Sequence, residues 1–320
     1  MALVLRGRNV WDGLSDGPRP LDVVVNERTV LGVQPMGSYS ASDDDVIFEL
    51  GEGFLLPGLL DMHVHLVWDG SPNPAVTVER EGEQLTTIRA GANAGAQLRA
   101  GVTTVRDLGS NWDIAITVAR AISHGIIDGP EVIASGRTVI MTGGHDPFWG
   151  IFSDGVDAVR RAVRHQVHMG AGVIKAAATG GAYGRPEGED IGQVELSYDE
   201  LAALAAEAHR FGLKATAHAL GAEGVRNAVL AGFDCIEHGV FLDEQIVDEM
   251  LERHTVYSPT VATYRALAAG NGIPEYAQHK AERVIAAHRE SVAMALAAGI
   301  PIVAGTDAGA PNMPSPSGRP

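Results

Sequence analysis

The sequence reads Phe54-Leu-Leu-Pro-Gly-Leu-Leu-Asp-Met-His-Val-His-Leu66 at the point where its pattern changes, and this stretch predicts the fold. Pro57-Gly58 marks a turn, and the apolar run after it has the length of a buried strand. Because side chains alternate between the faces of a strand, His63 and His65 should point the same way as Asp61. Two imidazoles on one rigid strand suit a divalent metal. A His-x-His pair also occurs among ordinary core or surface histidines, so the rest of the chain must decide.

The chain before this stretch reads as short strands without a helical period. Turn-forming Gly, Pro, Asn and Asp separate the apolar runs. We therefore expect a small N-terminal β-sandwich layer over residues 1–53, too small to form an independent core. Its expected strands are Leu3–Val10, Leu21–Val25, Thr29–Val33 and Val46–Leu50.

The chain after this stretch alternates between strand-like and helix-like segments. The expected helices are Val76–Arg99, Ile114–Ser123, Val156–Met169, Tyr198–Phe211, Glu223–Ala231, Asp243–His254 and Tyr276–Ala298. The expected strands between them are Val102–Arg106, Glu131–Ser135, Val173–Ala178, Lys214–Ala219, Cys235–Glu237, Val256–Val261 and Pro301–Ala304. With the opening strand, this alternation predicts an α/β fold of the (β/α)8 TIM-barrel type over residues 54–320. In such barrels the functional groups lie at the C-terminal ends of the strands.

Residues that bind metals or carry protons stand at or near those predicted strand ends. Each has an ordinary alternative: His218 or His238 could be hydrogen-bonded core histidines, Lys175 could pair with a carboxylate, and Asp307 could cap a helix. Their joint placement favours a metal site over a coincidence. The set is His63, His65, Lys175, His218, His238 and Asp307.

These motifs resemble the amidohydrolase superfamily, and in particular its imidazolonepropionase-like branch, which includes Xaa-Pro dipeptidases. The resemblance is carried by Asp61-Met-His-Val-His65, Gly101-Val-Thr-Thr-Val-Arg-Asp-Leu-Gly109, Thr142-Gly-Gly-His145, Lys175, His218, Ile236-Glu-His-Gly239 and Gly305-Thr-Asp307. Relatives continue beyond the last motif, so we expect this chain to lack the C-terminal part of the β layer and the last helix.

The resemblance implies a site with two divalent metal ions, expected to be zinc. His63, His65 and Asp307 would bind one ion, and His218 and His238 the other. Lys175, carbamylated by carbon dioxide, would bridge the two ions. A hydroxide between the ions would attack the substrate, and Asp307 would accept its proton and pass it to the leaving amine.

The expected reaction is hydrolysis of an amide or peptide-like C–N bond, as in N-acyl amino acids or dipeptides. Alternatives are a cyclic amide, an ester or an organophosphate as substrate, and a non-catalytic relative that serves as a scaffold. His145 is a candidate for the catalytic machinery or for substrate binding, as Tyr183, Arg185 and Tyr264 are for substrate binding; each could instead be an ordinary loop residue. Relatives that cleave dipeptides often have Tyr at the place of Leu220, which weakens a dipeptidase assignment.

Composition narrows the classes of partner. A formal net charge of −16 argues against nucleic acid and anionic membranes as partners. Cys235 is the only cysteine, and the N-terminus does not read as a signal peptide, so we expect a cytoplasmic protein. We further expect a small-molecule substrate and a homo-oligomer.

Overall fold

The computed structural model describes residues 1–316 and shows two compact units. The first unit comprises Met1–Leu59 and the second begins at Leu60; each is described by itself. Residues 317–320, the end of the predicted 54–320 domain, lie outside the described residues.

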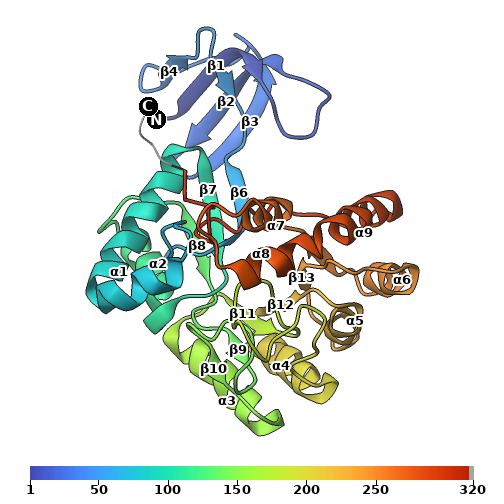
Figure 1. The fold of residues 1–320 in the computed structure, drawn as a ribbon. Helices are drawn as coiled ribbons and strands as arrows, with labels where there is room; N and C mark the ends of the chain where they lie inside the picture. The colour runs from blue at the N-terminus through green and yellow to red at the C-terminus, as the bar shows by residue number, and fades with distance from the viewer. Residues whose placement is uncertain (317–320) are drawn as a thin grey trace. The chain divides into compact units, whose positions relative to one another are not determined.

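The first unit is one β-sheet with strand order β3-β2-β1-β4, in which β5 also pairs with β1 (Figure 1). The strands are β1 (Leu3–Val10), β2 (Arg19–Asn26), β3 (Thr29–Pro35), β4 (Val46–Glu49) and β5 (Phe54–Leu55). Its core is small and centres on Val4 and Val24. Between the central strands β1 and β2, the Arg6 Nε donates to Asp22 Oδ1 at 2.8 Å. The four predicted strands are present, and the second sheet of the predicted sandwich stays a prediction.

The second unit contains parallel strands that alternate with helices. Strands β6 (Leu59–Val64), β7 (Val102–Asp107) and β8 (Glu131–Ala134) are adjacent in that order. A longer sheet has the order β10-β9-β11-β12-β13-β14, and its pairs are parallel. Its strands are β9 (Val139–Ile140), β10 (Ile151–Phe152), β11 (Val173–Ala177), β12 (Lys214–Ala219), β13 (Cys235–His238) and β14 (Val256–Ser258).

The helices of this unit lie outside its strands (Figure 1). They are α1 (Pro74–Arg99), the short η1 (Asn111–Asp113), α2 (Ile114–Ser123), α3 (Val156–Met169), α4 (Tyr198–Arg210), α5 (Ala222–Leu230), α6 (Glu244–Glu252), α7 (Val261–Ala268), α8 (Glu275–Glu282) and α9 (Ile285–Ala298). Helix α4 begins with a capping box between Ser197 and Glu200. The main core packs side chains of the helices, such as Leu204 and Met250, against strand residues such as Ile174 and Ile236.

Three predicted elements near the C-terminus are wrong in detail. The predicted helix Tyr276–Ala298 is two helices, α8 and α9. The predicted strand Val256–Val261 ends at Ser258, because Pro259 has no N–H to donate and Thr260 has a φ of 48°. The predicted strand Pro301–Ala304 forms only an isolated bridge between Ile302 and Tyr257.

The segment after Pro301 nevertheless runs beside both β14 and β6. The Tyr257 N–H donates to the Pro301 carbonyl at 2.9 Å, and the Met62 N–H donates to the Ala304 carbonyl at 2.8 Å. Further along, the Asp307 N–H donates to the His63 carbonyl at 2.7 Å. The backbone therefore brings Asp307 directly beside the histidines of the opening strand.

Within residues 1–316, none of the helices combines the length and apolar character that crossing a membrane requires.

Candidate metal centre

His63, His65 and Asp307 form a buried cluster at the end of β6. The Nε2 atoms of His63 and His65 lie 3.7 Å and 3.3 Å from Asp307 Oδ1. One ligand atom from each of the three residues lies within 4.8 Å of the other two. Two imidazoles and one carboxylate that converge in this way can hold a divalent ion such as zinc.

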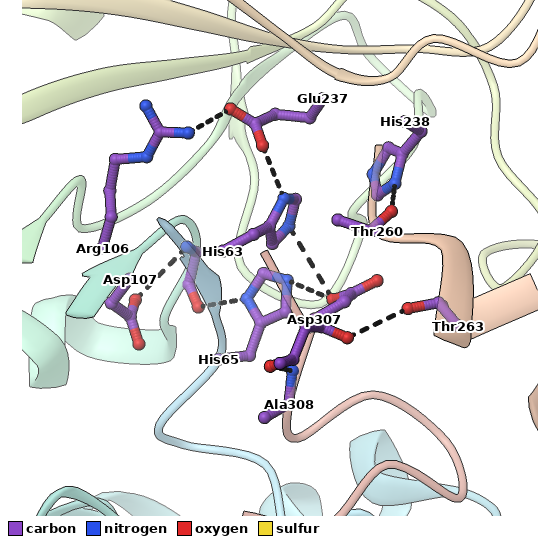
Figure 2. A network of polar contacts seen from close by, with 12 residues as sticks. His63, His65, Arg106, Asp107, Glu237, His238, Thr260, Thr263, Asp307 and Ala308 are labelled. Carbon is purple, nitrogen blue, oxygen red and sulfur yellow. Dashed lines mark hydrogen bonds and ion pairs between the residues drawn. The ribbon is translucent and has the colours of Figure 1, made fainter. Parts of the chain in front are cut away.

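Hydrogen bonds behind the histidines turn both Nε2 atoms toward Asp307 (Figure 2). His63 Nδ1 lies 2.8 Å from Glu237 Oε2, and His65 Nδ1 lies 3.1 Å from the Gly109 carbonyl oxygen. Since these oxygens only accept, each Nδ1 donates a proton to them, which leaves Nε2 as the nitrogen that can bind a metal. Partners of this kind orient the ligands of metal sites.

His238 and His218 continue the cluster away from β6. The rings of His63 and His238 are 5.0 Å apart, and those of His238 and His218 are 4.6 Å apart. The Thr260 hydroxyl donates to the Pro259 carbonyl and therefore accepts from His238 Nδ1 at 2.6 Å. His238 Nε2 is thereby left free, as in His63 and His65. His218 differs, because its Nε2 faces the Gly180 carbonyl at 3.4 Å.

Lys175 lies on β11 beneath the histidines and is 2% exposed. Burial lowers the pKa of its amine. Burial also holds the pKa values of His218 and His238 well below their ordinary range, and the nearby Lys175 adds to this effect. Burial opposes ionisation of Asp307, but the imidazoles of His63 and His65 hold the pKa of this carboxyl below its usual range. Burial lowers the pKa of His63, whereas burial of His65 is outweighed by its contact with Asp307, which raises the pKa of His65. A metal ion bound here would therefore displace a proton from His65.

Two of these residues have backbones in the left-handed region. His238 has a φ of 72° and Asp307 a φ of 61°, which is uncommon for residues other than glycine. The turn around Asp307 is held by Asp61, which accepts from the Thr306 N–H at 2.9 Å and from its hydroxyl at 2.5 Å. Gly305 beside it has no room for a side chain, since a Cβ would lie 2.9 Å from that of His63.

A cavity opens above the cluster and is walled by aromatic rings. Trp149 stacks on His65 with ring centres 4.8 Å apart, and Trp68 packs against Trp149 at 4.4 Å. All the predicted metal ligands except Lys175 line this cavity. So do three of the four predicted substrate contacts, namely His145, Tyr183 and Tyr264.

His145 lies at the edge of the cluster among carboxylates. Its ring stacks on His218 with centres 4.0 Å apart. Its Nδ1 lies 2.7 Å from Glu189 Oε1, its Nε2 lies 3.3 Å from Asp146 Oδ1, and its backbone N–H donates to Glu195 at 2.7 Å. Burial opposes protonation, but Asp146 and Glu189 raise the pKa of His145 to about 9.

The other predicted substrate contacts differ in position. The Tyr183 hydroxyl donates to Asn73 Oδ1, and the Tyr264 ring lies 5.7 Å from that of His238. Arg185 is not among the described residues that line the cavity. Its guanidinium instead donates to the Gly188 carbonyl at 3.0 Å, and its role in substrate binding stays a prediction.

Sequence reasoning missed Glu237, although it stands in the Ile236-Glu-His-Gly239 motif. Glu237 is fully buried and joins His63 to Arg106, whose Nη2 donates to Glu237 Oε1 at 2.6 Å. Alternation along a strand would place Glu237 and His238 on opposite faces. The left-handed φ of His238 breaks that alternation, so both neighbours serve the same site.

Known proteins resemble this chain over most of its length. The sequence profile described as "Amidohydrolase family" matches residues 54–317. Ochratoxinase of Aspergillus niger is 30% identical over 289 residues, which cover 82% of this chain and 59% of ochratoxinase. This chain therefore spans about 59% of the length of that curated relative.

Solved structures share the fold. A Xaa-Pro dipeptidase with methionine bound in its active site is 29% identical and superposes with a TM-score of 0.86, over 98% of this chain and 81% of the dipeptidase. The crystal structure of the Aspergillus niger ochratoxinase is 26% identical with a TM-score of 0.84, over 98% of this chain and 77% of the other.

Proposed function

This chain belongs to the amidohydrolase family, as its motifs predict, and we propose that it hydrolyses an amide-type C–N bond in an N-acyl amino acid or a dipeptide. The observation that carries the proposal is the convergence of His63, His65 and Asp307 at the floor of an aromatic-walled cavity. The similarity to proteins named ochratoxinase and Xaa-Pro dipeptidase supports a C–N bond as the target.

His63, His65 and Asp307 would hold one divalent ion, and His218 and His238 a second, with zinc favoured by the imidazole-rich set. When bound, the ions would activate water as a nucleophile at neutral pH and polarise the scissile carbonyl. Glu237 would keep His63 oriented through its 2.8 Å contact with Nδ1.

We propose that Lys175 carries a carbamate that would supply an oxygen ligand to both ion sites. An unpaired ammonium is costly in a buried strand, and the lowered pKa of Lys175 favours the neutral amine that reacts with carbon dioxide. Carbamylation, with loss of one proton from the amine, converts this neutral group into an anionic oxygen donor near His63, His218 and His238.

Asp307 would move the proton during hydrolysis. Its ionised carboxylate can accept the proton that the attacking water loses, and can deliver it to the leaving nitrogen. An amide nitrogen leaves poorly unless it is protonated, so this transfer is needed for an amide. His145, beside His218, would contact the substrate as a hydrogen-bond donor.

We also infer that the strands of the second unit close into a (β/α)8 barrel. Supporting contacts are the bonds of the segment after Pro301 to Tyr257 and Met62, and the Gly172 N–H, which donates to the Ala134 carbonyl at 2.9 Å. A closed barrel would gather the C-terminal strand ends, and hence the site residues, on one face.

Metal analysis and a hydrolysis screen test the proposed function. The purified chain, reconstituted with zinc and bicarbonate, should bind up to two ions and release amine from N-acyl amino acids or dipeptides. His63→Asn should lose metal and activity. His209→Ala is the matched control, because His209 is exposed and pairs with Asp234 instead. Absence of bound metal after reconstitution, or full activity in His63→Asn, would overturn the proposal.

A further inference from the structure

A second cavity of about 450 Å³ adjoins the one above the metal centre. The two cavities share Trp68 and Tyr183 in their walls. A cavity of this size falls in the range that accepts small molecules. The walls of the second cavity include Trp68, Val76, Asn111, Trp112, Phe148 and Tyr276.

The lining of this aromatic pocket selects for an uncharged, flat group. Trp68, Trp112, Phe148, Tyr183 and Tyr276 contribute aromatic rings, which favour stacked or edge-to-face contact with another ring. Among the described residues that line it, none is a lysine or an arginine, and the single acidic one, Glu79, is exposed. A carboxylate would therefore find no counter-charge there.

The loop that carries Trp112 is held in an unusual conformation. Trp112 and Asp113 have φ values of 51° and 56°, and the Trp112 side chain is 46% exposed at the pocket. The loop is tied down by Asn111 Nδ2, which donates to the Phe148 carbonyl at 2.8 Å. Strained backbone that keeps a large aromatic ring exposed is typical of ligand-binding sites.

We propose that this aromatic pocket binds a planar, apolar group on one side of the scissile C–N bond. The substrates would be amides with an aromatic acyl or aromatic amine portion. The substrate class rests on the proposed hydrolytic function. The binding of a planar group in the pocket does not, because binding can be measured without hydrolysis.

The binding test uses 2-naphthamide, a neutral aromatic amide, titrated into the full chain by calorimetry. Trp112→Ala should weaken binding about three- to tenfold, the range for one lost aromatic contact. Val76→Trp, which fills the pocket from α1, should abolish binding. Phe152→Ala is the matched control, because this exposed ring does not line the pocket. Melting curves establish that each variant is folded.

The kinetic test compares N-(2-naphthoyl)glycine and N-acetyl-naphthylalanine with N-acetylalanine. Trp112→Ala should lower kcat/KM about three- to tenfold for the naphthyl substrate whose ring enters the pocket, and lower it less for N-acetylalanine. If the enzyme hydrolyses N-acetylalanine but Trp112→Ala and Val76→Trp leave naphthamide binding unchanged, the pocket proposal fails and the proposed function stands. If both variants weaken naphthamide binding but no amide is hydrolysed, the pocket stands and the proposed function fails.

Discussion

Replacement of Glu237 by glutamine should both destabilise the chain and weaken metal binding. The Glu237 carboxylate is fully buried and accepts from Arg106 Nη2 at 2.6 Å and from His63 Nδ1 at 2.8 Å. Glutamine keeps the shape and one acceptor oxygen, but its amide NH2 would face one of these two donors. The Arg106 guanidinium would also lose its buried counter-charge.

The expected loss of stability follows from this burial. Removing one partner of a buried ion pair costs about 3–5 kcal/mol. The control is Glu249→Gln, which breaks a bidentate pair with Arg226 at 2.8 Å on the surface, where Arg226 is 43% exposed. For such an exposed pair we expect a cost of about 0–1 kcal/mol. Glu237→Gln should also weaken zinc binding about 10–100-fold, the usual effect of losing a group that orients a ligand.

The assay is urea unfolding of the metal-free variants, followed by zinc competition against a chelator. Adding Arg106→Met to Glu237→Gln should restore part of the stability, because the unpaired cation is gone, but should not restore zinc affinity. If Glu237→Gln matches Glu249→Gln in unfolding free energy and in zinc affinity, Glu237 does not orient His63.

Three further predictions concern single carboxylates and the buried lysine. Lys175→Ala should lose metal and activity and regain part of both with short carboxylic acids; full activity without rescue would exclude the carbamate. Asp307→Asn should retain much of its zinc but lose on the order of a hundredfold in amide turnover, with a smaller loss for a matched activated ester; equal losses would contradict proton delivery to the leaving group. Burial raises the pKa of Asp107 to about 6, so its contribution to stability is complete below its unfolded pKa near 4 and is lost as pH rises through about 6. Asp107→Asn should therefore flatten the pH dependence of urea unfolding between about pH 4 and 6, and an unchanged slope would refute this assignment.

Periodicity predicted most of the second unit because strands such as β11 and β13 are buried on both faces and the helices on one. Helices α2 and α3 and strand β12 have the predicted bounds. The break between α8 and α9 was missed because Arg283 and Val284, unlike proline or glycine, do not signal an interruption. The segment after Pro301 reads as a strand by its apolar content, but the structure gives it only a bridge to Tyr257.

The cluster of His63, His65 and Asp307 could be predicted because these residues stand near strand ends in recognisable motifs. Their supporting partners could not, since they depend on contacts between distant segments. His145 meets Glu189 from 44 positions away, and His63 meets Glu237 from 174 positions away. No role was predicted for Trp68 or Trp112, because nothing in a linear pattern indicates that their rings line the same cavity.

The left-handed backbones of His238 and Asp307 set a limit on how this protein can be improved. Each such residue stores roughly 1–3 kcal/mol of conformational strain, which glycine would relieve at once. Selection for thermal tolerance alone would therefore favour glycine at two positions whose side chains the proposed reaction needs. Glycine at positions 238 and 307 would stabilise the backbone but remove the imidazole and the carboxylate of the proposed site. A more stable variant must therefore be sought in the supporting helices.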